Sequence, residues 1–245
     1  MTIVCIETST SVCSAAICKD GAPIKQCINY EGSNHARLLP LYIEELLAFA
    51  REQRLDIDAV ALSEGPGSYT GLRIGTSTAK GLCYGLNIPL IPVPTLEVLC
   101  EAAKERLEVR GESLEDSILL PMIDARRMEV YAAIYDSRQL NVESLKLKEA
   151  RAVVVENEDS LIANSQQLIA NSQVYYFGDG AEKCSKIFTK PNWHYLPGIV
   201  PEARFLGLIV GRPSVDRRDS KQLAYYEPYY LKEFVAAPSH VKGLA

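Results

Sequence analysis

The chain has 245 residues, of which 47% are hydrophobic and 23% are charged, and its formal net charge is −5 at pH 7. This composition is typical of a globular protein with one large domain or two smaller ones. The acidic balance argues against autonomous nucleic-acid binding, which normally needs a basic face. The chain shows no basic leader with an apolar core and no run of about 18 apolar residues, so we expect no signal peptide and no membrane span.

Seven cysteines stand mostly in apolar, strand-like stretches, and no two of them have the spacing Cys-x-x-Cys. The absence of this spacing excludes the common zinc and thioredoxin-like motifs. An odd number of buried thiols is typical of reduced cysteines in the cytoplasm. We therefore expect a cytoplasmic protein.

The first half of the chain predicts a hairpin followed by alternating strands and helices. Apolar alternation and turn residues predict strands over 2–7, 12–18 and 23–30, a helix over 35–54, a strand over 58–63, a helix over 68–86, a strand over 90–93 and a helix over 95–109.

The second half predicts the same order again. We expect strands over 118–124 and 129–135, an extended stretch over 145–155, a helix over 160–171, a strand over 174–177, a helix over 181–188, a weak strand over 194–196 and a helix over 201–210. Such a duplication is a strong indication of architecture. Two unrelated α/β units are the alternative.

Two sheet-and-helix halves that each open with a hairpin are the plan of the actin-like ATPase (ASKHA) fold, an α/β architecture of two duplicated RNase H-like lobes. We expect lobes over 1–110 and 111–231 that meet within the charged connector 108–116, and a mobile tail over 232–245. This is an analogy of fold and indicates no chemistry.

The segment 65–75, GPGSYTGLRIG, is a glycine-rich turn between a predicted strand and a predicted helix, but it fits neither a P-loop nor a dinucleotide fingerprint. Gly71, Gly75, Ala79 and Cys83 recur at four-residue intervals along the helix. Because each interior glycine costs a helix about 1 kcal/mol relative to alanine, we expect close packing of another helix against this side. The alternative is that the glycines fit the helix against its own sheet.

The predicted helix before this loop has an apolar arc of about 180°, wider than the stripe of somewhat over 100° that a surface helix needs. The arc consists of Leu38, Leu39, Tyr42, Ile43, Leu46, Leu47, Phe49 and Ala50. The excess predicts a docking surface shared with the glycine-rich helix. A helix buried in a thick monomeric core is the alternative.

The residues that actin-like enzymes use for catalysis are incomplete. Such enzymes place an acidic residue after the first strand for Mg²⁺; here Glu7, Thr8 and Ser9 stand there, and Asp124 ends the corresponding strand of the second half. Arg126 and Arg127 replace a small phosphate-binding turn, where they either neutralise phosphate or fill the cleft and pair with an acid. No two of the three histidines, at 35, 194 and 240, are spaced as metal ligands, and no serine elbow occurs.

Six segments in this order resemble the bacterial TsaB (YeaZ) family: IVCIETS at 3–9, NHARLLP at 34–40, GPGSYTGLRIG at 65–75, IDAR at 123–126, GDGA at 178–181 and PYYL at 228–231. The resemblance covers residues 2–231, and the glycine segment is its most specific part.

The resemblance implies a non-catalytic subunit that binds and activates a TsaD-like threonylcarbamoyltransferase. The product would be N6-threonylcarbamoyladenosine after the anticodon of tRNAs that read codons beginning with A. A TsaE-like ATPase joins through the complex, the protein alone forms a homodimer, and tRNA is reached only through the complex. No cofactor is implied beyond weak or partner-completed ATP or ADP with magnesium. A stand-alone actin-fold ATPase or phosphotransferase is the alternative, and a hydrolase is a weaker one.

The two expected sites follow from the pattern and the resemblance together. Weak nucleotide contact is expected at Glu7, Thr8, Ser9 and Asp124. The partner-binding residues are expected to be His35, Leu38, Leu39, Tyr42, Ile43, Leu46, Tyr69, Gly71, Leu72, Arg73, Gly75, Thr76 and Ala79. A charge at Leu39 or Ile43 is expected to abolish pairing and to leave the monomer folded.

Overall fold

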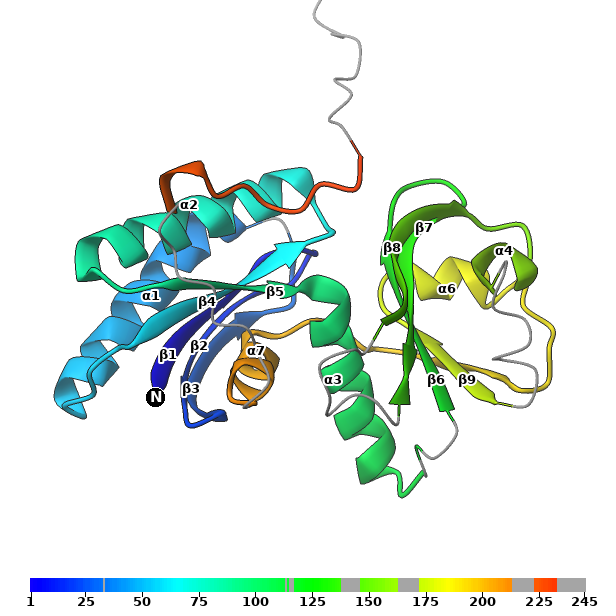
Figure 1. The fold of residues 1–245 in the computed structure, drawn as a ribbon, viewed down its shortest axis with the longest axis horizontal. Coiled ribbons are helices and arrows are strands. Elements are labelled where there is room, and N and C mark those ends of the chain that lie inside the picture. The colour runs from blue at the N-terminus through cyan, green and yellow to red at the C-terminus, as the bar shows by residue number, and fades with distance from the viewer. Residues whose placement is uncertain are drawn as a thin grey trace, which may run out of the picture.

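In the computed structural model, two five-stranded mixed sheets lie in two lobes joined by a long helix (Figure 1). The structure describes residues 1–32, 34–112, 114, 117–137, 146–162, 172–212 and 223–232. None of the helices in these ranges is both long enough and apolar enough to pass through a bilayer.

The first sheet has the order β3-β2-β1-β4-β5. Its strands are β1 (Thr2–Glu7), β2 (Cys13–Lys19), β3 (Ala22–Asn29), β4 (Ala59–Gly65) and β5 (Leu90–Pro94). The strands β1, β2 and β3 are antiparallel, and β4 and β5 run parallel to β1. The central strands β1 and β2 are buried on both faces, which explains why they are apolar almost throughout.

The second sheet repeats this topology, in the order β8-β7-β6-β9-β10. Its strands are β6 (Ser117–Asp124), β7 (Glu129–Asp136), β8 (Lys146–Val154), β9 (Gln173–Phe177) and β10 (Trp193–Leu196). The strands β6, β7 and β8 are antiparallel, and β9 and β10 are parallel to β6. The predicted duplication and the actin-like α/β fold are thus confirmed.

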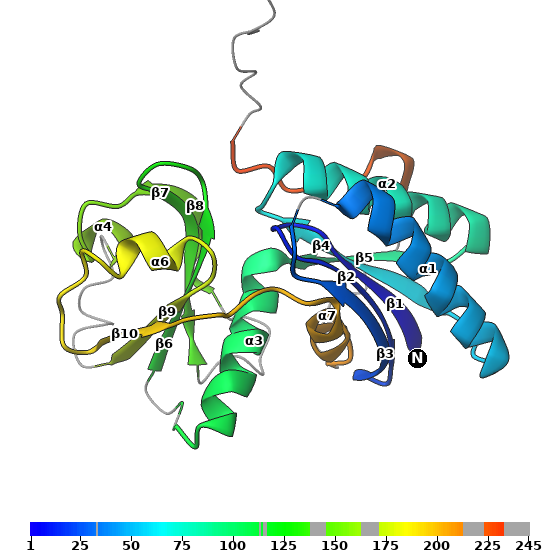
Figure 2. The same ribbon diagram turned by 180° about the vertical axis from the view of Figure 1, so that it is seen from behind.

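Two long helices cover one face of the first sheet, as Figure 2 shows from behind. They are α1 (His35–Glu52) and α2 (Tyr69–Leu86). Leu39 and Leu46 of α1 and Ala79 of α2 lie in one buried cluster with residues of β1, β2 and β4. The N-cap of α2 is Ser68, whose hydroxyl accepts a hydrogen bond from the Gly71 amide.

The last helices of the two repeats lie on the other face of the first sheet and between the lobes. They are α3 (Thr95–Val109) and α7 (Ala203–Val210). α3 contacts β6 of the second sheet, whereas α7 follows β10 in the chain and packs on β1, β2 and β3 of the first sheet. A single hydrophobic core runs through both helices from Cys5 in the first sheet to Tyr135 in the second.

The packing of α7 on the first sheet is close and specific. A Cβ on Gly207 would lie 2.3 Å from the Cys18 sulfur, and the amide of Ala203 donates to the Ser14 hydroxyl at 2.9 Å. The Arg204 guanidinium binds both oxygens of Glu105 on α3, at 2.6 and 2.7 Å. By chain order α7 belongs to the second lobe, whereas it packs on the sheet of the first. The lobe boundaries at 110 and 231 therefore stay predictions.

Short elements complete the described chain. They are α4 (Asp159–Ile162), α6 (Ala181–Cys184) and a 3₁₀ turn, η2 (Leu223–Tyr225). The helix predicted over 181–188 is therefore shorter than expected. Most of the helix predicted over 160–171, and the predicted tail apart from Lys232, lie outside the described residues.

The segment 223–232, here called the C-terminal strap, runs along α2 toward the second lobe (Figure 1). Lys80 of α2 donates to the carbonyl oxygens of Ala224 and Tyr226 at 2.7 and 3.2 Å. The Tyr229 amide then donates to the Glu64 carbonyl at 2.8 Å. The strap thereby joins α2 and the end of β4 to the entrance of the space between the lobes.

Candidate functional site

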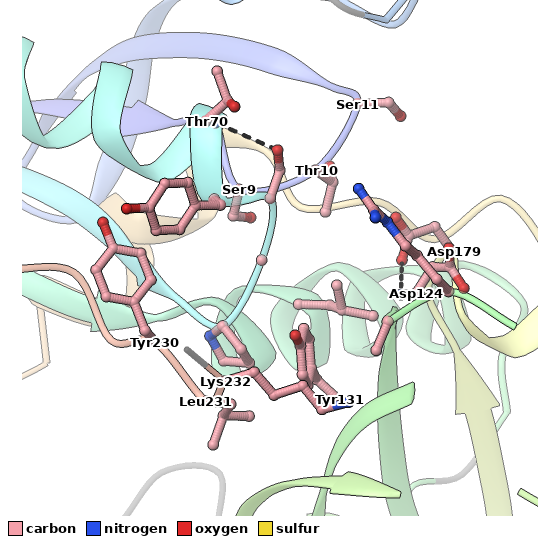
Figure 3. Close-up of a pocket in the computed structure, with 18 of the residues that line it drawn as sticks. Ser9, Thr10, Ser11, Thr70, Asp124, Tyr131, Asp179, Tyr230, Leu231 and Lys232 are labelled. Carbon is pink, nitrogen blue, oxygen red and sulfur yellow. Dashed lines mark hydrogen bonds between the residues drawn. The ribbon is translucent and has the colours of Figure 1, made fainter. Parts of the chain in front are cut away.

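A cleft of about 1370 Å³ lies between the lobes. Its lining includes residues 9–11 of the β1–β2 turn, residues 66–71 at the start of α2, residues 123–129 around the β6–β7 turn and residues 229–232 of the strap. Figure 3 shows Ser9 and Thr10 on the side of the first lobe, and Asp124 and Asp179 on the side of the second. The turns β1–β2 and β6–β7 are corresponding parts of the two repeats, and both line this cleft.

The first wall of the cleft is held by close contact between the β1–β2 turn and α2. The Thr8 hydroxyl donates to the Gly71 carbonyl at 2.8 Å, and the Ser68 amide donates to the Ser9 carbonyl at 2.6 Å. A Cβ on Gly75 would lie 2.3 Å from the Thr8 hydroxyl oxygen. The small-residue side of α2 therefore packs on its own chain, and the expectation that another helix covers Gly71, Gly75 and Ala79 is wrong in this structure.

Glu7 is enclosed beneath the same turn. Its Oε1 accepts hydrogen bonds from the Ser9 amide and hydroxyl at 2.6 and 2.5 Å, and the side chain is fully buried. Burial raises the pKa of the Glu7 carboxyl, although the hydroxyls of Ser63 and Ser9 lower it. Of the four expected nucleotide contacts, only Ser9 and Asp124 line the cleft. Because Glu7 does not reach the cleft, the residues present do not fit a magnesium-bound nucleotide of the actin-like kind.

The second wall carries charged side chains. Lys183 forms an ion pair with Asp124, and the Asp124 amide donates to Asp179 at 2.9 Å. Desolvation raises the pKa of the Asp179 carboxyl, although the hydrogen bond from the Asp124 amide lowers it. Arg126 and Arg127 form the tip of the β6–β7 turn, where both have positive φ.

The histidines of the described chain have structural partners. His35 is buried with its Nε2 2.9 Å from the Thr10 carbonyl, and His194 lies 2.6 Å from Gln173 on the second sheet. Within the described ranges, no group of three or more His, Cys, Asp and Glu side chains is placed to hold a metal ion.

The expected partner-binding residues divide by burial. Arg73 is exposed, and Leu38, Tyr42 and Tyr69 are half-buried. The others are buried within this chain: His35, Leu39, Ile43, Leu46, Gly71, Leu72, Gly75, Thr76 and Ala79. The expectation that a charge at Leu39 or Ile43 leaves the monomer folded is therefore corrected, because both side chains belong to its core.

A shallow groove between α1 and α2 has a volume of about 460 Å³. Its lining adds residues that the sequence analysis did not name, among them Ala36, Pro40 and Ser77. Farther along α2, Gly81 and Gly85 are exposed, and a Cβ at either would meet no atom of the described chain within 4 Å. We call residues 36, 40, 41, 70, 73, 74, 77, 81, 84 and 85 the α1–α2 face. The sequence does indicate this face, because Ser77, Gly81 and Gly85 recur at four-residue intervals and so lie on one side of α2.

The family model for TsaD, described as tRNA N6-adenosine threonylcarbamoyltransferase, matches residues 30–202 of this chain, which is more than half of its length. Proteins named "tRNA threonylcarbamoyladenosine biosynthesis protein TsaB" are similar to it in sequence. The relative from Haemophilus influenzae is 35% identical over 54% of this chain, and the one from Bacillus subtilis is 34% identical over 55%. The chain therefore belongs to the family that this TsaD-type model describes, and within it to the TsaB (YeaZ) proteins.

These two TsaB alignments cover 52% and 55% of the relatives, so the chain spans about half the length of the curated relatives it matches there. The TsaB of Buchnera aphidicola subsp. Baizongia pistaciae aligns over 95% of this chain and 98% of its own length, at 28% identity. The solved structure of YeaZ from Pseudomonas aeruginosa matches 94% of this chain and 99% of its own, with a TM-score of 0.68 and 24% identity. This likeness shows that the TsaB fold extends over both lobes.

Proposed function

We propose that this protein is a subunit in the formation of threonylcarbamoyladenosine in tRNA, where it binds and activates a TsaD-like transferase and performs no chemistry itself. Its membership of the TsaB family supports the pathway. The observation that carries the non-catalytic role is the enclosure of Glu7, because the acidic group of the first hairpin is turned inward and hydrogen-bonded to Ser9.

The α1–α2 face is the surface on which we place the partner. Gly81 and Gly85 each cost α2 about 1 kcal/mol relative to alanine, and no atom of the described residues packs where their side chains would be. Glycine permits a second backbone to approach closely. A partner helix lying against these positions therefore explains why α2 has glycine there, whereas the described contacts within the monomer do not.

Exposed apolar side chains at the edge of the face support the same assignment. Tyr84 is 86% exposed and Leu41 is 55% exposed. Large aromatic side chains that enter a partner's pocket contribute most to many interfaces. In the absence of the transferase, we expect a second copy of the chain to occupy this face, while a TsaE-like ATPase and tRNA join through the complex in the cytoplasm.

The test is to co-express the tagged chain with the TsaD-like protein of its own organism and to measure the co-purified partner. In parallel, the modified nucleoside is quantified by mass spectrometry in tRNA from cells that depend on the introduced copy. Tyr84→Ala and Ser77→Arg are expected to reduce the complex at least about tenfold, the effect of losing one anchor of about 1.4 kcal/mol or more.

Val109→Ala is the matched control, because Val109 is 80% exposed but lies at the end of α3, away from the face. Unchanged complex formation and nucleoside levels in both face variants would refute the placement of the partner. Sustained ATP turnover by the isolated chain would instead favour a stand-alone ATPase or phosphotransferase.

A further inference from the structure

We propose that the cleft between the lobes binds single-stranded RNA, with the guanidinium groups of Arg126 and Arg127 on two phosphates. This inference rests on the proposed function for its choice of RNA, but the site is a different surface from the α1–α2 face. We call these two residues the arginine turn.

The backbone of the arginine turn is held in an unfavourable conformation. Arg126 and Arg127 have φ of 71° and 48°, a region that residues with a side chain seldom adopt. The hairpin is closed by hydrogen bonds from the Ala125 amide to the Glu129 carbonyl at 3.0 Å and from the Glu129 amide to the Arg126 carbonyl at 3.1 Å. Glycine or asparagine would fit such a turn better. Strained residues of this kind are concentrated at binding sites, where the strain is retained for function.

Among the described residues of this wall, the two guanidinium groups are the cations without an ion-pair partner. Lys183 is paired with Asp124, and Lys232 is paired with Glu129. Neither arginine forms a hydrogen bond or ion pair with any residue that the structure describes, and both side chains are exposed and line the cleft. Arginine stays protonated at all relevant pH values and matches phosphate oxygens with two parallel N–H groups.

The rest of the cleft suits an RNA strand. Tyr131 is half-buried in the cleft lining and Tyr229 is 42% exposed there, and bases stack on such rings with little sequence preference. Hydroxyl groups of Thr10 and Ser11 line the opposite wall, seen with Tyr131 in Figure 3, and can donate to phosphate oxygens. The volume of about 1370 Å³ exceeds the roughly 300–1,000 Å³ of small-molecule pockets. An extended occupant therefore fits better than a mononucleotide.

The net charge of −5 sets the expected strength of binding. Because this net charge opposes RNA binding, the affinity of the chain alone depends on the two local contacts and is low, and stable binding of tRNA still requires the complex. For a single strand that releases counterions at two phosphates, the slope of log K against log salt is about −1.4.

The experiment measures the fluorescence anisotropy of a labelled oligoadenylate of about ten nucleotides, titrated with the full-length chain at several salt concentrations. Arg126→Gly and Arg127→Gly are the test variants, because glycine accepts the positive φ and the turn keeps its shape. Each is expected to weaken binding on the order of tenfold and to reduce the slope to about −0.7. Arg54→Gly is the control, since Arg54 is also exposed with a positive φ of 53° but lies after α1, outside the cleft.

The absence of binding at low salt, or equal loss in the Arg54 variant, overturns the proposal. So does stronger binding of AMP or MgATP than of the oligonucleotide, because the occupant would then be a free nucleotide. Co-purification of the TsaD-like partner is measured with the wild type, the arginine-turn variants and the α1–α2 face variants. If the wild type binds the partner but no RNA, this inference fails and the proposed function stands. If RNA binding depends on the arginine turn but the face variants keep the partner, the placement of the partner fails and this inference stands.

Discussion

Gly71 lies directly against Thr8, so that a Cβ on Gly71 would be 2.1 Å from the Thr8 carbonyl oxygen. This contact locks the first turn of α2 onto the β1–β2 turn and shapes one wall of the cleft. Neither backbone can give way easily, because the Thr8 hydroxyl also donates to the Gly71 carbonyl at 2.8 Å.

Gly71→Ala is therefore expected to destabilise the protein by about 1–3 kcal/mol, the cost of forcing an atom into a packed site. Urea unfolding followed by circular dichroism measures the change. An equal or higher unfolding midpoint would contradict the close contact.

Gly81→Ala is expected to act in the opposite direction on the monomer. A Cβ at Gly81 meets none of the described residues within 4 Å, so the substitution gains up to about 1 kcal/mol of helix stability. If a partner backbone lies against this position, the same variant binds the TsaD-like protein more weakly. Thermal unfolding and co-purification test the two effects; a variant that is more stable and binds normally would argue against close helix packing here.

Leu39 and Leu41 form a matched pair on α1. Leu39 is fully buried, whereas Leu41 is 55% exposed. Leu39→Ala is expected to cost about 2–5 kcal/mol in the free energy of unfolding, and Leu41→Ala less than about 0.5 kcal/mol. The effect of a charge on partner binding should therefore be measured at Leu41. A folded, stable Leu39→Glu protein would contradict the burial of Leu39 in the core.

The buried carboxyl of Glu7 predicts a pH dependence of stability. Burial raises its folded-state pKa above the ordinary value of 4.5, so at pH values between the two pKa values the native state holds a proton that the unfolded chain has released. The stability that this proton provides is fully present below pH 4.5 and is lost as pH rises through the folded-state pKa. Glu7→Gln removes the titrating group and keeps an acceptor for the Ser9 donors.

Melting temperatures of both proteins across pH 4–8 measure this effect. The wild type is expected to lose stability relative to Glu7→Gln as pH rises. A constant difference between the two curves would show that Glu7 does not titrate differently in the folded state.

Lys80 tests the attachment of the C-terminal strap. Its ammonium group donates to two strap carbonyls, those of Ala224 and Tyr226. Lys80→Met keeps much of the side-chain length and removes both bonds, which together contribute about 1–3 kcal/mol. Hydrogen exchange of the amide of Tyr229 is expected to accelerate, and unchanged protection would contradict a role of Lys80 in holding the strap.

Much of the fold follows from local patterns. The apolar alternation from Thr2 to Cys18, repeated from Ile118 to Tyr135, predicts both hairpins because strand periodicity is a property of neighbouring residues. The helix over 35–54 and the turn before Ser68 were predictable for the same reason. The shorter helix at Ala181–Cys184 was not, because a few helix-favouring residues do not fix where packing ends a helix.

The candidate site was predicted less well. The wide apolar arc of α1 predicted a docking surface, which stays a prediction, but it did not distinguish Leu39, in the core, from Leu38, which is only half-buried. The glycines of α2 look alike in sequence, yet Gly71 packs on Thr8 and Gly81 is open. What a side chain meets depends on segments far away in the chain, which a local pattern does not contain.

The sequence by itself determined the repeated order of strands and helices and the family of the protein, because both depend on residues read along the chain. Only the tertiary structure decided that α7 packs on the first sheet, that Glu7 is enclosed, and that Arg126 and Arg127 line the cleft without an ion pair to any described residue. These features depend on contacts between residues separated by as many as 189 positions, as between Ser14 and Ala203. Such contacts form only when the whole chain has closed around its common core.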